Sequence, residues 1–251
     1  MKKTYIHIIA FIISILSFTS CEVANQLVAD YESSETSNLR ESEVIQGLKR
    51  ALNIGADMAV SDLSKPDAFY SNAAYKILLP KEAQFITDNK NNPLLQAVGV
   101  DKMINDVEIS MNKAAEKAVN QAKPIFVNAI TNMSIQDAFG ILNGSDTAAS
   151  NYLRRSTYQQ LYAQFKPEIS KTLNQPIYKG VSTNYAWSNL TSAYNGVANF
   201  VPSWNHIDTN LDNYVTNKAL QALFEEIKNE EKKIRKDPAA RVEDILKKVF
   251  K

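Results

Sequence analysis

The sequence contains few of the residues on which most catalytic and metal sites depend. Its 251 residues include one cysteine, Cys21, and two histidines, His7 and His206. We expect His7 to be removed with a signal peptide, which leaves His206 as the only imidazole of the mature chain. Di-iron bundles need a Glu-x-x-His motif on each of two helices, so they are excluded. A Ser-His or Cys-His catalytic pair is nearly excluded for the same reason.

Glycine and proline are also scarce, with seven and eight residues. So few turn residues favour helices over a turn-rich all-β fold. No glycine-rich phosphate loop is present, and no serine lies in a nucleophile-elbow context. Asp208–Asp212 imitates the start of a calcium loop, but Asn213 and Ala219 occupy the positions where that loop needs Gly and Glu. We therefore expect no catalytic constellation, no metal and no cofactor.

The charges are nearly balanced. Subtracting the two lysines of residues 1–20 from 28 basic side chains leaves 26, against 27 acidic ones. A near-neutral chain lacks the basic surface that nucleic acid requires, so we expect no nucleic-acid partner. A protein partner or a small ligand stays open.

The first residues have the pattern of an export signal. Lys2 and Lys3 precede an apolar run, Ile8–Leu16, which is shorter than the ~20 residues that span a bilayer. The run Leu16–Cys21 resembles a bacterial lipoprotein signal, although Phe18 and Ser20 depart from its usual residues. We predict a signal peptide at 1–20 and lipid on Cys21, which anchors the protein to a membrane of the bacterial cell envelope, facing the periplasm or the outer surface. The alternative is an ordinary secretory signal that ends near a cysteine.

Beyond Cys21 the sequence predicts a tether and one helical domain. Residues 21–37 are polar and lack a sustained period, which is typical of a flexible tether. The helical domain is predicted over 38–251. Its central element is a C-terminal helix whose apolar residues, from Leu211 to Ile234, fall on two faces, as in a helix inside a bundle. Thr209 is the expected cap, and Asp237-Pro238 the expected end, with a second short helix reaching Phe250.

The remaining segments also favour helices. The fold class is therefore all-α, a single multi-helix, bundle-like domain around the central helix. A short extended piece at Ile77–Pro80 stays open. The expected helices, with the residues that begin or end them, are 38–63; a short one after Pro80; 94–98; 101–122, capped by Asp101; a run to Met133; one from Ser134, closed by left-handed Asn143-Gly144; 147–165, capped by Ser145; and two weaker ones within 167–200.

Charged residues on the apolar faces are the candidate site. Glu231 falls on the stripe of Ile227 and Ile234, and an unpaired carboxylate is costly there. We predict that Glu231 is buried and pairs with an arginine, first Arg241 and otherwise Arg235. Further candidates for this buried ion pair or binding site are Lys218, in register with the other apolar face, and Arg154, in a tyrosine-rich helix.

Four stretches carry a resemblance to a known family. They read ALNIGADMAVSDL at Ala51–Leu63, MNKAAEKA at Met111–Ala118, DAFGILNGSDTAA at Asp137–Ala149, and YVTNKAL, EEKKIR and LKKVF within Asp208–Phe250. The pattern resembles an uncharacterised family of bacterial envelope proteins, domain of unknown function 4197, over nearly all of the mature chain. The resemblance implies an export signal and a single helical domain, and it supplies no activity and no functional residues. Gln221-Ala222 stands where that family usually has Asp-Gly, and Ala68 where it has Gly.

Three hypotheses for the function follow. The first is a membrane-tethered helical domain with a non-enzymatic role in binding or structure. The second is an enzyme that uses the carboxylate and arginine chemistry of Glu231, Arg235 and Arg241. The third is a carrier of an apolar ligand between helices, suggested by the aromatic residues from Tyr152 to Trp204.

Overall fold

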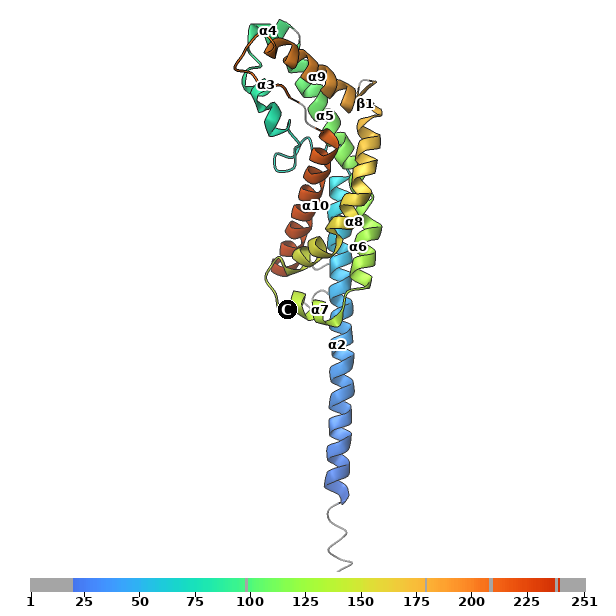
Figure 1. Cartoon of the computed structure of the whole chain (residues 1–251). Helices are drawn as coiled ribbons and strands as arrows, with labels where there is room; N and C mark the ends of the chain where they lie inside the picture. Colours follow the sequence, from blue (N-terminus) through green and yellow to red (C-terminus); the bar gives the residue numbers. More distant parts are fainter. Residues whose placement is uncertain (1–19, 98, 179, 208–209, 238, 240–251) are drawn as a thin grey trace, which may run out of the picture. The chain divides into compact units, whose positions relative to one another are not determined.

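The computed structural model describes residues 20–97, 99–178, 180–207, 210–237 and 239, with side chains from residue 41 onward except 177 and 178 (Figure 1). The chain divides into two compact units, Met1–Gly47 and Leu48–Lys251. The prediction of an all-α fold is confirmed, because the described residues are mostly helical with one short hairpin. In chain order the elements are α2 (Ser20–Leu63), the 3₁₀ helix η1 (Lys81–Ala83), α3 (Gln84–Asp88), α4 (Pro93–Ala97), α5 (Val100–Val119), α6 (Ala122–Thr131), α7 (Ile135–Leu142), α8 (Ala148–Leu173), β1 (Pro176–Tyr178), β2 (Val181–Ser182), α9 (Thr183–Ala198) and α10 (Leu211–Lys236).

The centre of the second unit is α10, as expected. It packs against α8 and α5, and Figure 1 shows it in red beside them. Apolar side chains from both of its faces are buried, which is why its sequence lacks a single polar face. The fully buried contributions to this core include Val215, Leu220 and Leu223 of α10, Leu153, Leu161 and Phe165 of α8, and Val107 and Met111 of α5. Burial of each such leucine or phenylalanine contributes about 1.5–3 kcal/mol to the free energy of folding.

The ends of α10 follow from its sequence. The side chain of Asn210 accepts a hydrogen bond from the Asn213 N–H and caps the helix. The cap is thus Asn210, one position after the predicted Thr209, which lies outside the described residues. The helix ends at Lys236, before Asp237-Pro238, as predicted. The second short helix to Phe250 lies outside the described residues.

Several boundaries differ from the prediction, and Ser145 does not cap α8, whose N-cap position is Thr147 without a side-chain hydrogen bond. Helix α8 runs through Pro167 to Leu173, where an end at Phe165 was expected. Helix α5 begins after Gly99, which has φ 73° and no side-chain cap, so Asp101 lies in the first turn and does not cap the helix. A hairpin, β1–β2, separates α8 from α9 and turns through Gly180, also at positive φ.

The prediction for the end of α7 was also partly wrong. Ser134 begins α7 and accepts a hydrogen bond from the Asp137 N–H, as expected. Asn143 has φ −87°, and Gly144 is not among the described glycines at positive φ. Gly144 is instead required by space, since a Cβ there would lie 2.6 Å from Ala148 Cβ and 2.7 Å from the Gly140 carbonyl oxygen.

Helix α2 begins at Ser20, so residues 21–37 fall within its helical span. Their role as a tether stays a prediction. None of the helices in the described part of the chain combines the length and the apolarity needed to cross a bilayer.

Candidate functional site

Glu231 is buried, with 8% of its surface exposed, and it lies on α10 against the start of α8. One carboxylate oxygen accepts the Ala149 N–H at 2.9 Å, and the other accepts the Ser150 N–H at 2.8 Å. These N–H groups belong to the first turn of α8 and have no partner within that helix. Glu231 therefore supplies the negative charge that the N-terminus of α8 attracts.

An arginine completes this arrangement. Arg235 lies one turn further along α10, and its Nε donates to Glu231 at 2.9 Å. Its Nη2 donates to the Ile141 carbonyl at 2.9 Å, which connects α10 to α7. The expected partner Arg241 lies outside the described residues. The cavity beside this pair holds about 20 Å³ and is lined mostly by apolar side chains of α2, α8 and α10. That is room for about one water molecule.

The other two sequence candidates lie elsewhere on the surface. Neither Lys218 nor Arg154 lines the cavity beside Glu231. Arg154 is exposed, with its guanidinium 5.8 Å from the ring centre of Phe224, in a hollow of about 410 Å³. Lys218 is exposed on α10, with its ammonium 5.9 Å from the ring centre of Tyr214. The structure thus joins Glu231 with Arg235 only, and a binding role for these residues stays a prediction.

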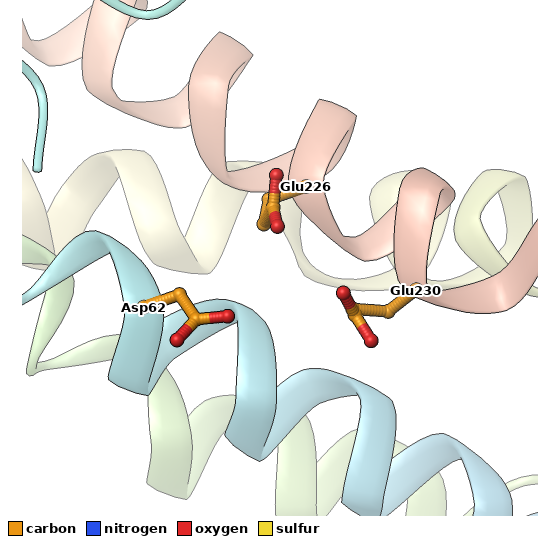
Figure 2. A group of neighbouring side chains, drawn as sticks. All are labelled: Asp62, Glu226 and Glu230. Carbon is orange, nitrogen blue, oxygen red and sulfur yellow. The ribbon is translucent and has the colours of Figure 1, made fainter. Parts of the chain in front are cut away.

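A second carboxylate cluster includes Glu230, the residue that precedes Glu231 on α10. Figure 2 shows Asp62 of α2 opposite Glu226 and Glu230 of α10, and one oxygen from each lies within 4.8 Å of the others. Glu230 is 2% exposed. Oxygens at this spacing are the ligand type that Ca²⁺ and Mg²⁺ take in proteins.

Two lysines and a tyrosine form ion pairs and a hydrogen bond with these carboxylates. Lys65 pairs with Asp62 at 2.6 Å, and Lys233 pairs with Glu230, which raises the pKa of that lysine. The Tyr75 hydroxyl donates to Glu226. Burial, with the hydrogen bond to Glu226 next, raises the pKa of Tyr75 above its ordinary range, so the hydroxyl stays a donor. Two of the three carboxylates are therefore paired with lysines, and the third accepts a hydrogen bond from a neutral hydroxyl.

The segment between α2 and η1, residues 64–80, forms one wall of a groove along α10. It holds neither helix nor strand, so its backbone groups are satisfied by separate turns, such as Ser71 N–H to the Asp67 carbonyl at 2.9 Å, and by side chains of neighbouring helices. Asn112 of α5 is fully buried, accepts the Ile77 N–H at 2.9 Å and donates to the Ile77 carbonyl at 2.8 Å. Glu116, one turn later, accepts the Phe69 N–H at 3.4 Å. Two residues of α5 thus fix the course of the segment.

Tyrosines hold the same segment to α10. Tyr75 reaches Glu226, and its oxygen accepts from Asn229 at 2.9 Å. Tyr214 donates to the Leu78 carbonyl at 2.9 Å. The segment is therefore attached to α10 at two places about three helical turns apart.

Three adjoining hollows follow this wall, and we call them together the α10 groove. The acidic hollow, of about 600 Å³, includes Asp62, Asp67 and Glu226 in its lining. The middle hollow, of about 190 Å³, shares Tyr75 with the acidic one. The lysine hollow, of about 370 Å³, shares Lys76 and Lys218 with the middle one. The lining residues of the lysine hollow are Lys76, Leu78, Leu79, Lys81, Gln84, Thr87, Asp88, Glu108, Tyr214 and Lys218.

The sequence reasoning identified one residue of this groove, Lys218, and missed the rest. Asn112 and Glu116 stand in the motif MNKAAEKA, on the face next to its alanine stripe. Polar residues beside a buried stripe are a usable signal, but their partner segment has no periodicity that would reveal it.

Comparison with known proteins shows a family and adds no activity. The chain matches a family model described as "Protein of unknown function (DUF4197)" over residues 38–251. Neither a curated protein nor a solved structure matches the chain.

Proposed function

Since the chain belongs to the DUF4197 family, whose description names no activity, we propose from its structure a non-enzymatic binding domain at the bacterial cell envelope. In this proposal a lipid on Cys21 holds the domain at a membrane, facing the periplasm or the outer surface. The ligand binds in the α10 groove.

The α10 groove is the observation that supports binding. Ligand sites are concave, usually about 300–1,000 Å³, and combine apolar walls with a few fixed polar groups. Two hollows of the groove, of about 600 and 370 Å³, fall in this range, and their wall is fixed by Asn112, Tyr75 and Tyr214. A wall that is already ordered before the ligand binds reduces the loss of conformational entropy on binding.

The two rival functions have less support. An enzyme around Glu231 and Arg235 needs an open carboxylate, but both oxygens of Glu231 are engaged beside a cavity of about 20 Å³. The same cavity is too small for an apolar ligand between helices, which is what a carrier needs. Tyr194 and Trp204, two of the aromatics that suggested a carrier, stack on each other with ring centres 5.5 Å apart.

The anchor rests on the sequence signal and is tested separately from the groove. Cys21→Ala should move the protein from the membrane fraction to the soluble fraction, because the lipid is its only predicted anchor. Intact mass of the membrane-bound protein should show a diacyl or triacyl group on Cys21. A mature protein with an unmodified start, or cleaved elsewhere, would contradict the anchor and leave the groove unaffected.

Occupancy of the groove is tested in living cells. A photo-crosslinking amino acid replaces Ala74, an exposed residue that lines the middle hollow. The matched control replaces Ala163, an exposed alanine on α8. After irradiation we expect the protein carrying the crosslinker at 74, and not at 163, to gain a discrete mass. No added mass at 74, or the same mass at both positions, would overturn binding in the groove.

A further inference from the structure

We propose that the lysine hollow of the α10 groove binds a small organic anion through its carboxylate or phosphate group. This inference rests on the proposed function and names the chemical class of its ligand. Three lysines reach the hollow from three places, Lys76 from the wall segment, Lys81 from η1 and Lys218 from α10.

The positive charge in this hollow is only weakly compensated by neighbouring acids. Lys76 has one acidic neighbour, Glu108, at 3.9 Å, which is beyond hydrogen-bond distance. Among the described residues, Lys81 and Lys218 form no ion pair. In the acidic hollow, by contrast, the Lys65 ammonium lies 2.6 Å from the Asp62 carboxylate, whereas Lys113 and Asp67 are 3.7 Å apart, also beyond hydrogen-bond distance. The electrostatic contribution to binding should therefore be larger for an anion in the lysine hollow than for a cation in the acidic hollow.

The acids of the lysine hollow do not remove this charge. They are Asp88 and Glu108, against three lysines. Burial raises the pKa of Glu108, with Lys76 acting in the opposite direction. Burial thus disfavours the charged form of Glu108, and a ligand anion placed among the three lysines faces a lining in which bases outnumber acids.

The hollow also offers neutral donors and an apolar contact. The Thr87 hydroxyl and the Gln84 amide line it and supply hydrogen-bond donors beside the ammonium groups. Leu78 is 54% exposed at the rim although it is a large apolar residue. Lys76 is steadied by the ring of Tyr70, 3.9 Å from its ammonium. These groups suit an anion that carries a short hydrocarbon part.

Lysine is a point charge and does not by itself distinguish a carboxylate from a phosphate. The experiment therefore separates these two sources. The full-length lipidated protein in neutral detergent is titrated by calorimetry with succinate, with glycerol 1-phosphate and with inorganic phosphate, and choline serves as a cationic probe. We expect heat from at least one anion and none from choline, with weaker binding at higher salt.

Variants that remove one lysine charge test whether the anion binds in the lysine hollow. Lys81→Gln and Lys218→Gln should each weaken the anion's affinity about 2–5-fold, the effect of one partly exposed charge pair, and the double variant more than either. Lys228→Gln removes a charge from the same helix outside the hollow and should change affinity less than about 2-fold. Equal weakening by Lys228→Gln would show that the attraction belongs to the whole surface and would overturn the site.

The result also separates this inference from the proposed function. If no anion binds while the crosslinker at position 74 still gains mass, the groove binds a ligand and the class named here is wrong. If the anions bind but no mass is gained, the hollow has the stated chemistry and the proposed occupancy in cells is wrong.

Discussion

Glu231 illustrates how the fold stabilises a buried charge. Its two oxygens satisfy two N–H groups at the start of α8, and Arg235 neutralises it. Removing one partner of such a group leaves the others buried and unsatisfied. The residue therefore connects three helices, α7, α8 and α10, through one carboxylate and one guanidinium.

Glu231→Ala should lower the free energy of unfolding by about 3–5 kcal/mol, because it removes the buried carboxylate shared by the Ala149 and Ser150 N–H groups and by Arg235. Urea unfolding followed by circular dichroism measures this. The control is Lys65→Ala, which breaks an exposed pair with Asp62 and should change stability by less than about 1 kcal/mol. A loss below about 1 kcal/mol for Glu231→Ala would show that the pair is only a surface contact.

Glu116 should make stability depend on pH. Burial raises the pKa of its carboxyl above the ordinary value of 4.5, with the Phe69 N–H and Lys113 acting in the opposite direction. A carboxyl with a raised pKa in the folded state favours folding in its protonated form, so its contribution is present below pH 4.5 and is lost as the pH rises.

Glu116→Gln cannot ionise and keeps an oxygen that accepts the Phe69 N–H. The difference in unfolding free energy, variant minus wild type, should therefore become more positive between about pH 4 and about pH 7. Urea titrations at both pH values test this, and Glu108, whose pKa is also raised, contributes equally to both proteins. A difference that is constant or falls with pH is the contrary outcome.

At the scale of the element, helix boundaries depend on which residues face solvent. Pro167 cannot donate a hydrogen bond to the residue four positions earlier, Ala163, and was therefore expected to mark a boundary. Both residues are exposed in α8, so water can satisfy the carbonyl that lacks a donor. Burial of Phe165 and Ile169 on the opposite side then keeps the helix continuous.

The α7–α8 connection gives a matched test with two glycines. Gly144→Ala should destabilise the protein by about 1–3 kcal/mol, because its Cβ would meet Ala148 and the Gly140 carbonyl oxygen. Gly196→Ala, inside α9 with nothing within 4 Å of its Cβ, should instead stabilise by about 0.5–1 kcal/mol. Unfolding free energies that fall for both variants, or for neither, would contradict this account of Gly144.

At the scale of the whole molecule, the fold should not depend on a metal ion. In the one described cluster that could hold an ion, Asp62 and Glu230 are paired with Lys65 and Lys233, and Glu226 accepts a hydrogen bond from the Tyr75 hydroxyl. The thermal midpoint of the native protein should therefore move by less than about 1 °C with EDTA or with added Ca²⁺ or Mg²⁺, since a bound ion would stabilise by mass action. A rise of several degrees with one of these ions would show that the cluster holds it, and Glu226→Gln should then abolish the rise.

Three features could be predicted from the amino-acid sequence: the helical class, the position of the central helix, and the end of that helix at Asp237-Pro238. These depend on local physics: apolar spacing, capping and the geometry of proline act over one or two turns of chain. The burial of Glu231 followed in the same way, because its position on an apolar stripe requires compensation wherever the partner lies. The family resemblance is confirmed over residues 38–251, whereas the lipid anchor stays a prediction.

The surroundings of those residues follow from the tertiary structure alone. The N–H groups that Glu231 accepts are about 80 residues away in sequence, and the Asn112 clamp on Ile77 joins residues separated by 35 positions. The segment 64–80 has no helical or strand period, because its backbone is satisfied by separate turns and by side chains of α5 and α10 rather than by a regular repeat. The α10 groove exists only where that segment meets α10. No local sequence pattern specifies the contact between this segment and α10, since that contact depends on how whole helices pack.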